Sequence, residues 1–147
     1  MKDPVKFVKS AYQTLLTDAI EFSGSPVKFA IGEVSIADNN SYMVLSNINA
    51  VRTNNKHQFE YEVTVSLDVY SKQKVLLSDP FNPVDVIAER ALDLIIPSIN
   101  STGLDNSVDF EFKNWGLVDT NYSPVESYDA NRLMRRQINI IQTLIQL

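Results

Sequence analysis

The 147-residue sequence contains no cysteine and only one histidine, His57. Without cysteine, the chain has no disulfide framework, no thiolate zinc site and no cysteine nucleophile. A zinc site with one histidine would depend almost wholly on carboxylates, which is an unusual ligand set. A glycine-rich phosphate-binding loop and a metal-ligand motif are also missing. The sequence therefore predicts a protein without metal, cofactor or catalytic residues, and not an enzyme.

Long apolar runs and an excess of positive charge are missing as well. No run approaches the length of a membrane span, and the first residues lack an apolar segment of signal-peptide length. The net charge of −5 disfavours general nucleic-acid binding, which usually needs a basic face. We therefore expect neither a membrane nor a specific nucleic acid as a partner. The length and the 44% hydrophobic content predict one globular domain over residues 1–147.

The strongest pattern is the stretch FEYEVTVSLDVY, residues 59–70, in which apolar and polar side chains alternate. A period of two places one set on each face of a strand, so one face is buried and the other solvated. The pattern predicts the central strand of an antiparallel sheet. The buried set is Phe59, Tyr61, Val63, Val65, Leu67 and Val69, and the solvated set is Glu60, Glu62, Thr64, Ser66 and Asp68.

Two segments have apolar residues at three- and four-residue steps, which predicts amphipathic helices. The first helix begins after a capping Asp3 with Pro4 at its first position, and ends by Gly24 and Pro26. Its stripe is Val8, Ala11, Tyr12, Leu15, Leu16, Ala19 and Ile20. The second helix follows Asn82 and Pro83 and closes before Pro97, with a stripe of Val84, Ile87, Ala88, Ala91, Leu92 and Ile95.

The remaining segments are mostly extended. Residues 27–36 predict a strand with a bulge or bend at Gly32, and residues 42–51 predict a strand with Tyr42, Val44, Ile48 and Ala50 on one side. Residues 108–117 predict a strand with a bulge near Asn114. Residues 119–131 are interpreted as a polar lid, loop or arm. The spacing in residues 132–147 fits either a helix or a strand, and the isoleucines favour a terminal strand, buried in its own subunit or against another. Together these elements predict an α+β fold: an antiparallel sheet with two amphipathic helices packed on one face, a two-layer sandwich.

Few single residues suggest a role. His57 lies in a polar hairpin loop with Arg52 and Lys56, and is either an ordinary surface residue or part of a contact with an acidic partner. Trp115 is either a core residue or an interface anchor, because tryptophan is enriched among binding hot spots.

The order and character of these elements resemble the tail-completion or tail-terminator proteins of tailed bacteriophages. The matching features are the first helix, the GEVSIAD…YMVLSNI hairpin and the FEYEVTVSLDVYSK strand. They continue with the NPVDVIAERALDLI helix and the arginine-led RLMRRQINIIQTL strand. The resemblance covers most of the chain as a pattern of elements, without a signature motif.

This resemblance implies a structural virion protein of the phage neck or tail, assembled in the host bacterial cytoplasm and lacking catalytic residues. Its subunits form a ring, a hexamer or a dodecamer, which joins the portal or connector to the tail and leaves room for DNA in the lumen. The exposed edges, the loops and the terminal strand then carry the function. We expect Arg132, Arg135 and Arg136 either to pair with Glu60, Glu62 or Asp68 across a subunit boundary, or to be solvated surface charges.

Two other classes stay open. An adaptor would bind a peptide by strand addition along a free sheet edge, and would be a monomer. A small enzyme would need a pocket between the sheet and the helices, with Asp68, Asp79, Glu89 and His57 as its only acid–base candidates.

Overall fold

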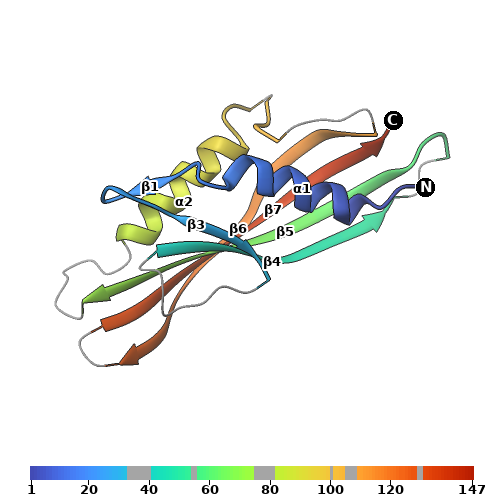
Figure 1. The fold of residues 1–147 in the computed structure, drawn as a ribbon. Helices are drawn as coiled ribbons and strands as arrows, with labels where there is room; N and C mark the ends of the chain where they lie inside the picture. Colours follow the sequence, from blue (N-terminus) through green and yellow to red (C-terminus); the bar gives the residue numbers. More distant parts are fainter. Residues whose placement is uncertain (33–40, 54–55, 75–81, 100, 105–108, 129–130) are drawn as a thin grey trace.

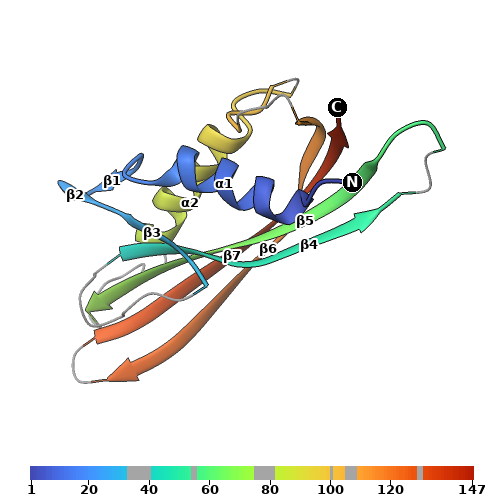
Figure 2. The ribbon, with the colours of Figure 1, turned by 45° about the vertical axis from the view of Figure 1, so that its right-hand side comes forward.

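The computed structural model describes residues 1–32, 41–53, 56–74, 82–99, 101–104, 109–128 and 131–147. Within these residues, two helices lie on one face of a five-stranded sheet, in the order β3-β4-β5-β7-β6 (Figures 1 and 2). The predicted α+β class and its two layers are confirmed. Neither helix described here has the length and apolarity needed to cross a bilayer.

Helix α1 (Pro4–Leu16) begins as the sequence predicts. One carboxylate oxygen of Asp3 accepts hydrogen bonds from the backbone N–H groups of Val5 and Lys6, at 2.9 and 3.3 Å. These N–H groups have no partner inside the helix, so the cap satisfies them. The face toward the sheet carries the buried residues Val8, Ala11, Tyr12 and Leu16.

The end of α1 differs from the prediction. The helix stops at Leu16, and Asp18 has a positive φ of 55° that turns the chain back. Ile20 is buried all the same, because the connection itself brings it to the core. The predicted terminator Gly24 lies instead in a small hairpin of β1 (Glu21–Phe22) and β2 (Ser25–Pro26). Its two turn residues, Ser23 and Gly24, both have positive φ, as a type I′ turn requires.

Strand β3 (Lys28–Ile31) pairs in parallel with β4 (Ser41–Arg52), whereas all the other pairs in the sheet are antiparallel. The sheet is therefore mixed, and the prediction of a wholly antiparallel sheet was wrong for this strand. Alternation identifies which face of a strand is buried, but it does not encode the direction of the neighbouring strand. Gly32 has a φ of 86°, in agreement with the predicted bend. The predicted continuation through Val34 and Ile36 lies outside the described residues.

A bulge divides β4 between Leu45 and Asn47, and it reverses the parity of the strand. The sequence predicted Tyr42, Val44, Ile48 and Ala50 on one side. Because of the bulge, Ile48 and Ala50 instead join Met43 and Leu45 against the core, and Tyr42 and Val44 lie on the opposite face.

Strand β5 (Glu60–Lys74) is the middle strand of the sheet, as predicted. Its residues Tyr61, Val63, Val65, Leu67 and Val69 are all buried, which confirms the predicted apolar face. The opposite face is not wholly solvated, because Ser66 is 9% exposed and Asp68 only 3% exposed. The prediction of a wet second face was therefore wrong at these two positions.

Helix α2 (Asn82–Ile95) buries Val84, Ile87, Ala88, Ala91 and Ile95, as the sequence predicts. The backbone N–H of Gly103 and the hydroxyl of Thr102 both donate to the carbonyl of Ile95, each at 3.0 Å. This short loop thereby satisfies a carbonyl at the end of the helix. Helix α2 lies against β5 and β7 and helix α1 against β3 and β4, and the apolar stripes of the two helices contribute to one core.

Strands β6 (Phe110–Tyr128) and β7 (Asn131–Gln146) form a long hairpin at one side of the sheet. The predicted bulge near Asn114 is present, as a register shift between Phe112 and Trp115. The prediction of a lid, loop or arm over residues 119–131 was wrong, because β6 continues to Tyr128. This part of β6 has few apolar residues, so the hydrophobic pattern gave no sign of a strand. It is a strand because its backbone forms hydrogen bonds with β7, and a pattern of side chains does not predict those bonds.

Candidate interaction surfaces

Strand β7, predicted as a buried terminal strand, lies between β5 and β6. It pairs with β5 from Asn131 to Ile145 and with β6 from Asn131 to Gln146. Both sides of its backbone are therefore hydrogen-bonded within the chain. The terminal strand is sheltered inside its own subunit, and its backbone is not an edge for a neighbouring copy.

The arginines of β7 lie on opposite faces of the sheet. Arg136 shares the helix face with Ile138 and Ile140, and its Nη1 lies 3.2 Å from a carboxylate oxygen of Asp85, in the first turn of α2. Its Nε donates to the hydroxyl of Thr120 on β6, at 2.9 Å. Arg136 thus links the helix layer, β7 and β6. In the sequence, this placement is indicated by the spacing: Arg136 is two and four residues from Ile138 and Ile140, and such residues share one face of a strand.

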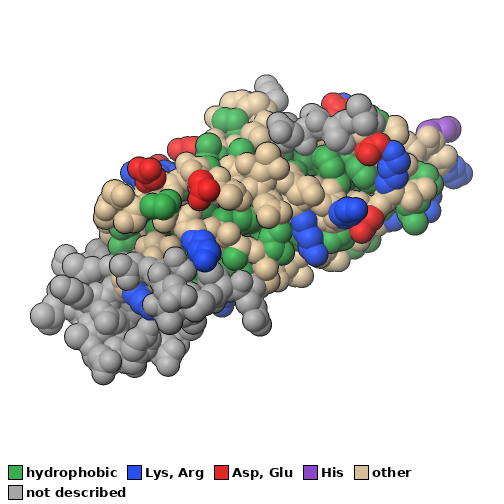
Figure 3. All heavy atoms as spheres, in the orientation of Figure 1, with side chains coloured by type: hydrophobic (Ala, Val, Ile, Leu, Met, Phe, Trp, Pro, Cys, Tyr) green, Lys and Arg blue, Asp and Glu red, His purple; other side chains and the backbone are tan. Residues whose placement is uncertain are grey.

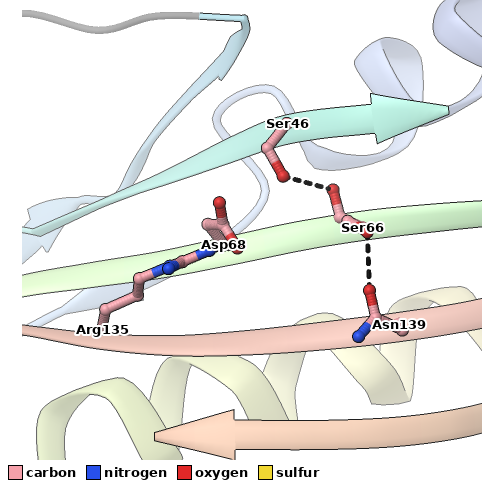
Figure 4. Close-up of polar contacts among 5 residues, drawn as sticks. All are labelled: Ser46, Ser66, Asp68, Arg135 and Asn139. Atoms are coloured by element: carbon pink, nitrogen blue, oxygen red, sulfur yellow. Dashed lines mark hydrogen bonds and ion pairs between the residues drawn. The ribbon is translucent and has the colours of Figure 1, made fainter. Parts of the chain in front are cut away.

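Arg135 lies on the other face, which carries the polar contacts in Figure 4. Its Nη2 is 3.2 Å from a carboxylate oxygen of Asp68, on the neighbouring strand β5. Close by, the hydroxyl of Ser66 donates to Oδ1 of Asn139 at 2.6 Å, and Ser46 in the bulge donates to the backbone carbonyl of Ser66 at 3.3 Å. The pairing with Asp68 predicted across a subunit boundary is thus formed within one chain.

Two tyrosines extend this polar face. The rings of Tyr42 and Tyr70 stack with their centroids 4.9 Å apart. Burial raises the pKa of the Tyr70 hydroxyl, the negative charge of Asp68 raises it further, and Arg135 acts in the opposite direction. Tyr70 is therefore a neutral hydroxyl at ordinary pH, so the charge of this region resides in the Asp68–Arg135 pair.

The remaining predicted interface residues are dispersed. Glu62 is exposed on β5, whereas the Glu60 carboxylate accepts from the Thr53 hydroxyl at 3.1 Å and from the Gln58 amide at 3.4 Å. Two others are placed by their backbones: Arg132 in β7 pairs with both β5 and β6, and Trp115 in β6 lies opposite Gln142.

The hairpin between β4 and β5 brings together Arg52, Lys56 and His57, all exposed. The Arg52 guanidinium carbon lies 4.9 Å from the centre of the Phe59 ring. This end of the molecule is at the right in Figure 3, where the single histidine is purple and Lys and Arg side chains lie around it.

The acid–base candidates of the enzyme alternative do not converge. Asp68 is paired with Arg135, Glu89 is exposed on α2, and His57 is at the hairpin tip. Asp79 lies outside the described residues. In the part of the chain that the structure describes, no three histidine or acidic side chains gather closely enough to hold a metal ion.

Two backbone edges bound the sheet in the described residues. Strand β6 has a neighbour on one side only, and β3 covers β4 only from Tyr42 to Leu45, which leaves the rest of β4 as an edge. Unpaired edges present N–H and C=O groups to any extended chain of suitable register. These edges were not recognised in the sequence, because the strand order decides which strands are outermost.

Comparison with known proteins adds no relative: no protein-family model matches the sequence, and no curated protein matches it.

Proposed function

We propose that this protein is a structural subunit of a phage neck or tail, which joins copies of itself into a ring through the two edges of its sheet. The observation that supports this is that, among the described residues, one sheet has an unpaired edge at each of its opposite sides: β6 on one side and the second half of β4 on the other. The sequence resemblance to tail-completion proteins supports it independently.

The directions of the strands suit repeated addition of identical copies. Strands β4, β5, β7 and β6 run alternately up and down, so β6 is antiparallel to β4. If copies are placed side by side in one orientation, β6 of each copy meets β4 of the next as an antiparallel pair. Such a head-to-tail contact closes into a ring when its rotation divides a full turn, and no free edge then remains.

The hydrogen-bond pattern identifies the backbone groups at these edges. The N–H of Thr53 donates to Glu60, so alternate residues before it, Arg52, Ala50 and Ile48, direct their N–H groups away from β5. On the other side, the N–H of Leu147 donates to Asp109, so the odd-numbered residues of β7 face β6. Thr120 is paired with the even-numbered Ile138, and therefore directs its N–H outward.

A pair of variants at Thr120 tests the edge contact. Thr120→Val and Thr120→Pro both lose the hydroxyl that Arg136 contacts, but only proline also removes the outward N–H. Proline is compatible with this type of position, because Pro124 occupies an equivalent outward one on β6. We expect Thr120→Val to support ring assembly and Thr120→Pro to fold without assembling, as seen by circular dichroism and by electron microscopy of particles.

Cross-linking tests the order of the contact. The native chain has no cysteine, so Asn49→Cys on β4 and Asn121→Cys on β6 are the only thiols in the double variant. With a flexible bis-maleimide, head-to-tail rings yield a ladder of covalent multimers, whereas either single variant yields dimers at most. A double variant that gives only dimers contradicts the ring. The adaptor alternative, in which the same edge binds a peptide and the protein is a monomer, predicts no covalent multimers.

A further inference from the structure

We infer that the end of the molecule formed by the β4–β5 hairpin and the last residues of β7 is a binding site for an acidic peptide segment of another protein. The site is a shallow pocket of about 350 Å³, called here the tip pocket. The hairpin contributes Arg52 and residues 56–59, and β7 contributes Gln146 with Leu147 beside it. No aspartate or glutamate side chain lines the tip pocket in the described residues.

Two cations of the tip pocket are available to a ligand. In the part of the chain that the structure describes, neither Arg52 nor Lys56 has an acidic partner. Phe59 holds the Arg52 guanidinium in place, since a cation over an aromatic ring is attracted to its face. The nearest carboxylate in the sequence, Glu60, is bound by Thr53 and Gln58. An arginine restrained in this way loses little freedom when it binds a carboxylate.

The apolar residues that line the tip pocket indicate which kind of anionic ligand it would bind. Phe59 and Leu147 give it apolar surface beside the cations. A protein with a net charge of −5 repels a nucleic acid as a whole, and the two cations Arg52 and Lys56 displace few counterions from one. In a peptide that has carboxylates next to an apolar side chain, the carboxylates can pair with Arg52 and Lys56 while the apolar side chain packs on Phe59 and Leu147. The chemistry therefore favours an acidic, partly apolar peptide.

The position of the tip pocket connects it to the ring, and this step rests on the proposed function. In a ring built through lateral sheet edges, the ends of the strands lie on the two rims. The tip pocket is at one such end, where the Lys2 backbone N–H donates to Oε1 of Gln146 at 2.9 Å. Figure 2 shows the N-terminus and the C-terminus of the chain near this end of the sheet. The pocket would then be repeated around one rim, and the partner would be the next component of the particle.

Peptide binding to the purified protein tests the site. The probe is a fluorescein-labelled peptide of alternating glutamate and leucine, measured by fluorescence anisotropy at low salt. We expect Arg52→Glu and Lys56→Glu each to weaken binding about tenfold or more, because attraction becomes repulsion. Lys28→Glu, an equal change of charge at an exposed position of β3, is the matched control, and its affinity should stay within about twofold of the native value.

Other arms of the experiment separate this site from the ring. A single-stranded thymidine oligonucleotide should bind more weakly than the peptide, and Thr120→Pro should bind the peptide as the native protein does. Lys56→Glu, which lies outside the β4 edge, should still assemble. The inference is overturned if the native protein does not bind the peptide, if Lys28→Glu is as harmful as Arg52→Glu, or if the oligonucleotide binds more tightly. Loss of rings in Thr120→Val and Thr120→Pro alike would count against the proposed function alone.

Discussion

The hydroxyl of Tyr12 on α1 donates a 3.0 Å hydrogen bond to Oε1 of Gln142 on β7, and both residues are buried in the core. The bond joins two residues 130 positions apart in the sequence and connects the helix layer to the sheet. The Nε2 of Gln142 has no hydrogen-bond partner in the described residues. Among the described residues, the buried side chain of Gln142 is therefore held by a single hydrogen bond.

Tyr12→Phe should lower the free energy of unfolding by about 1–3 kcal/mol, because it leaves Oε1 of Gln142 buried without a donor. Tyr12→Phe/Gln142→Met replaces both polar groups and should recover most of the loss. Urea denaturation of the two single variants and the double variant measures the coupling. Strictly additive losses would contradict a direct bond between these groups.

Burial also raises the pKa of the Tyr12 hydroxyl above its ordinary value near 10. The folded state then keeps a proton that the unfolded state releases, so this contribution to stability is full below about pH 10 and is lost as the pH rises further. The loss is about 1.4 kcal/mol per pH unit for one proton. Tyr12→Phe should therefore lose stability less steeply above pH 10, and parallel curves for the two proteins would contradict the prediction.

The loop after α2 approaches the helix closely at Gly103. A Cβ atom added there would lie 1.8 Å from the carbonyl oxygen of Leu94, which is backbone and yields little. Gly103→Ala should therefore cost about 1–3 kcal/mol through displacement of the loop and its bond to Ile95. Gly116→Ala on β6 is the matched control: no atom lies within 4 Å of its added Cβ, and thermal unfolding should change little.

We expect loss of the Asp68–Arg135 ion pair to lower the stability of the subunit itself, and not only its assembly. Arg135→Met leaves the buried Asp68 carboxylate without its cation, at a cost of about 1–3 kcal/mol, since Arg135 is itself partly exposed to solvent. Arg135→Met/Asp68→Asn removes the buried charge and should regain much of this in urea denaturation. If Arg135→Met is as stable as the native chain but does not assemble, the arginine is part of the subunit interface instead.

Periodicity was enough to predict both helices, the central strand and the apolar faces that form the core. Asp3 and Pro4 mark the start of α1. The stripe from Val84 to Ile95 and the alternation from Tyr61 to Val69 each predict which face is buried, because side-chain direction follows from local backbone geometry. The same local rule failed at Ser46, where one extra residue reverses the faces of β4 without any mark in the composition.

The tertiary structure alone decided the strand order, and with it the candidate surfaces. It placed the apolar terminal strand β7 between β5 and β6 in its own subunit, one of the two burials that its composition allowed, and it made the polar segment to Tyr128 an edge strand, where the composition had indicated a lid, loop or arm. It also paired Arg135 with Asp68 and Arg136 with Asp85, residues 67 and 51 positions apart. Backbone hydrogen bonds between strands do not depend on the identity of the side chains. Residue composition therefore determines which faces are buried, while the strand order of the folded chain determines which edges and charges are left for a partner.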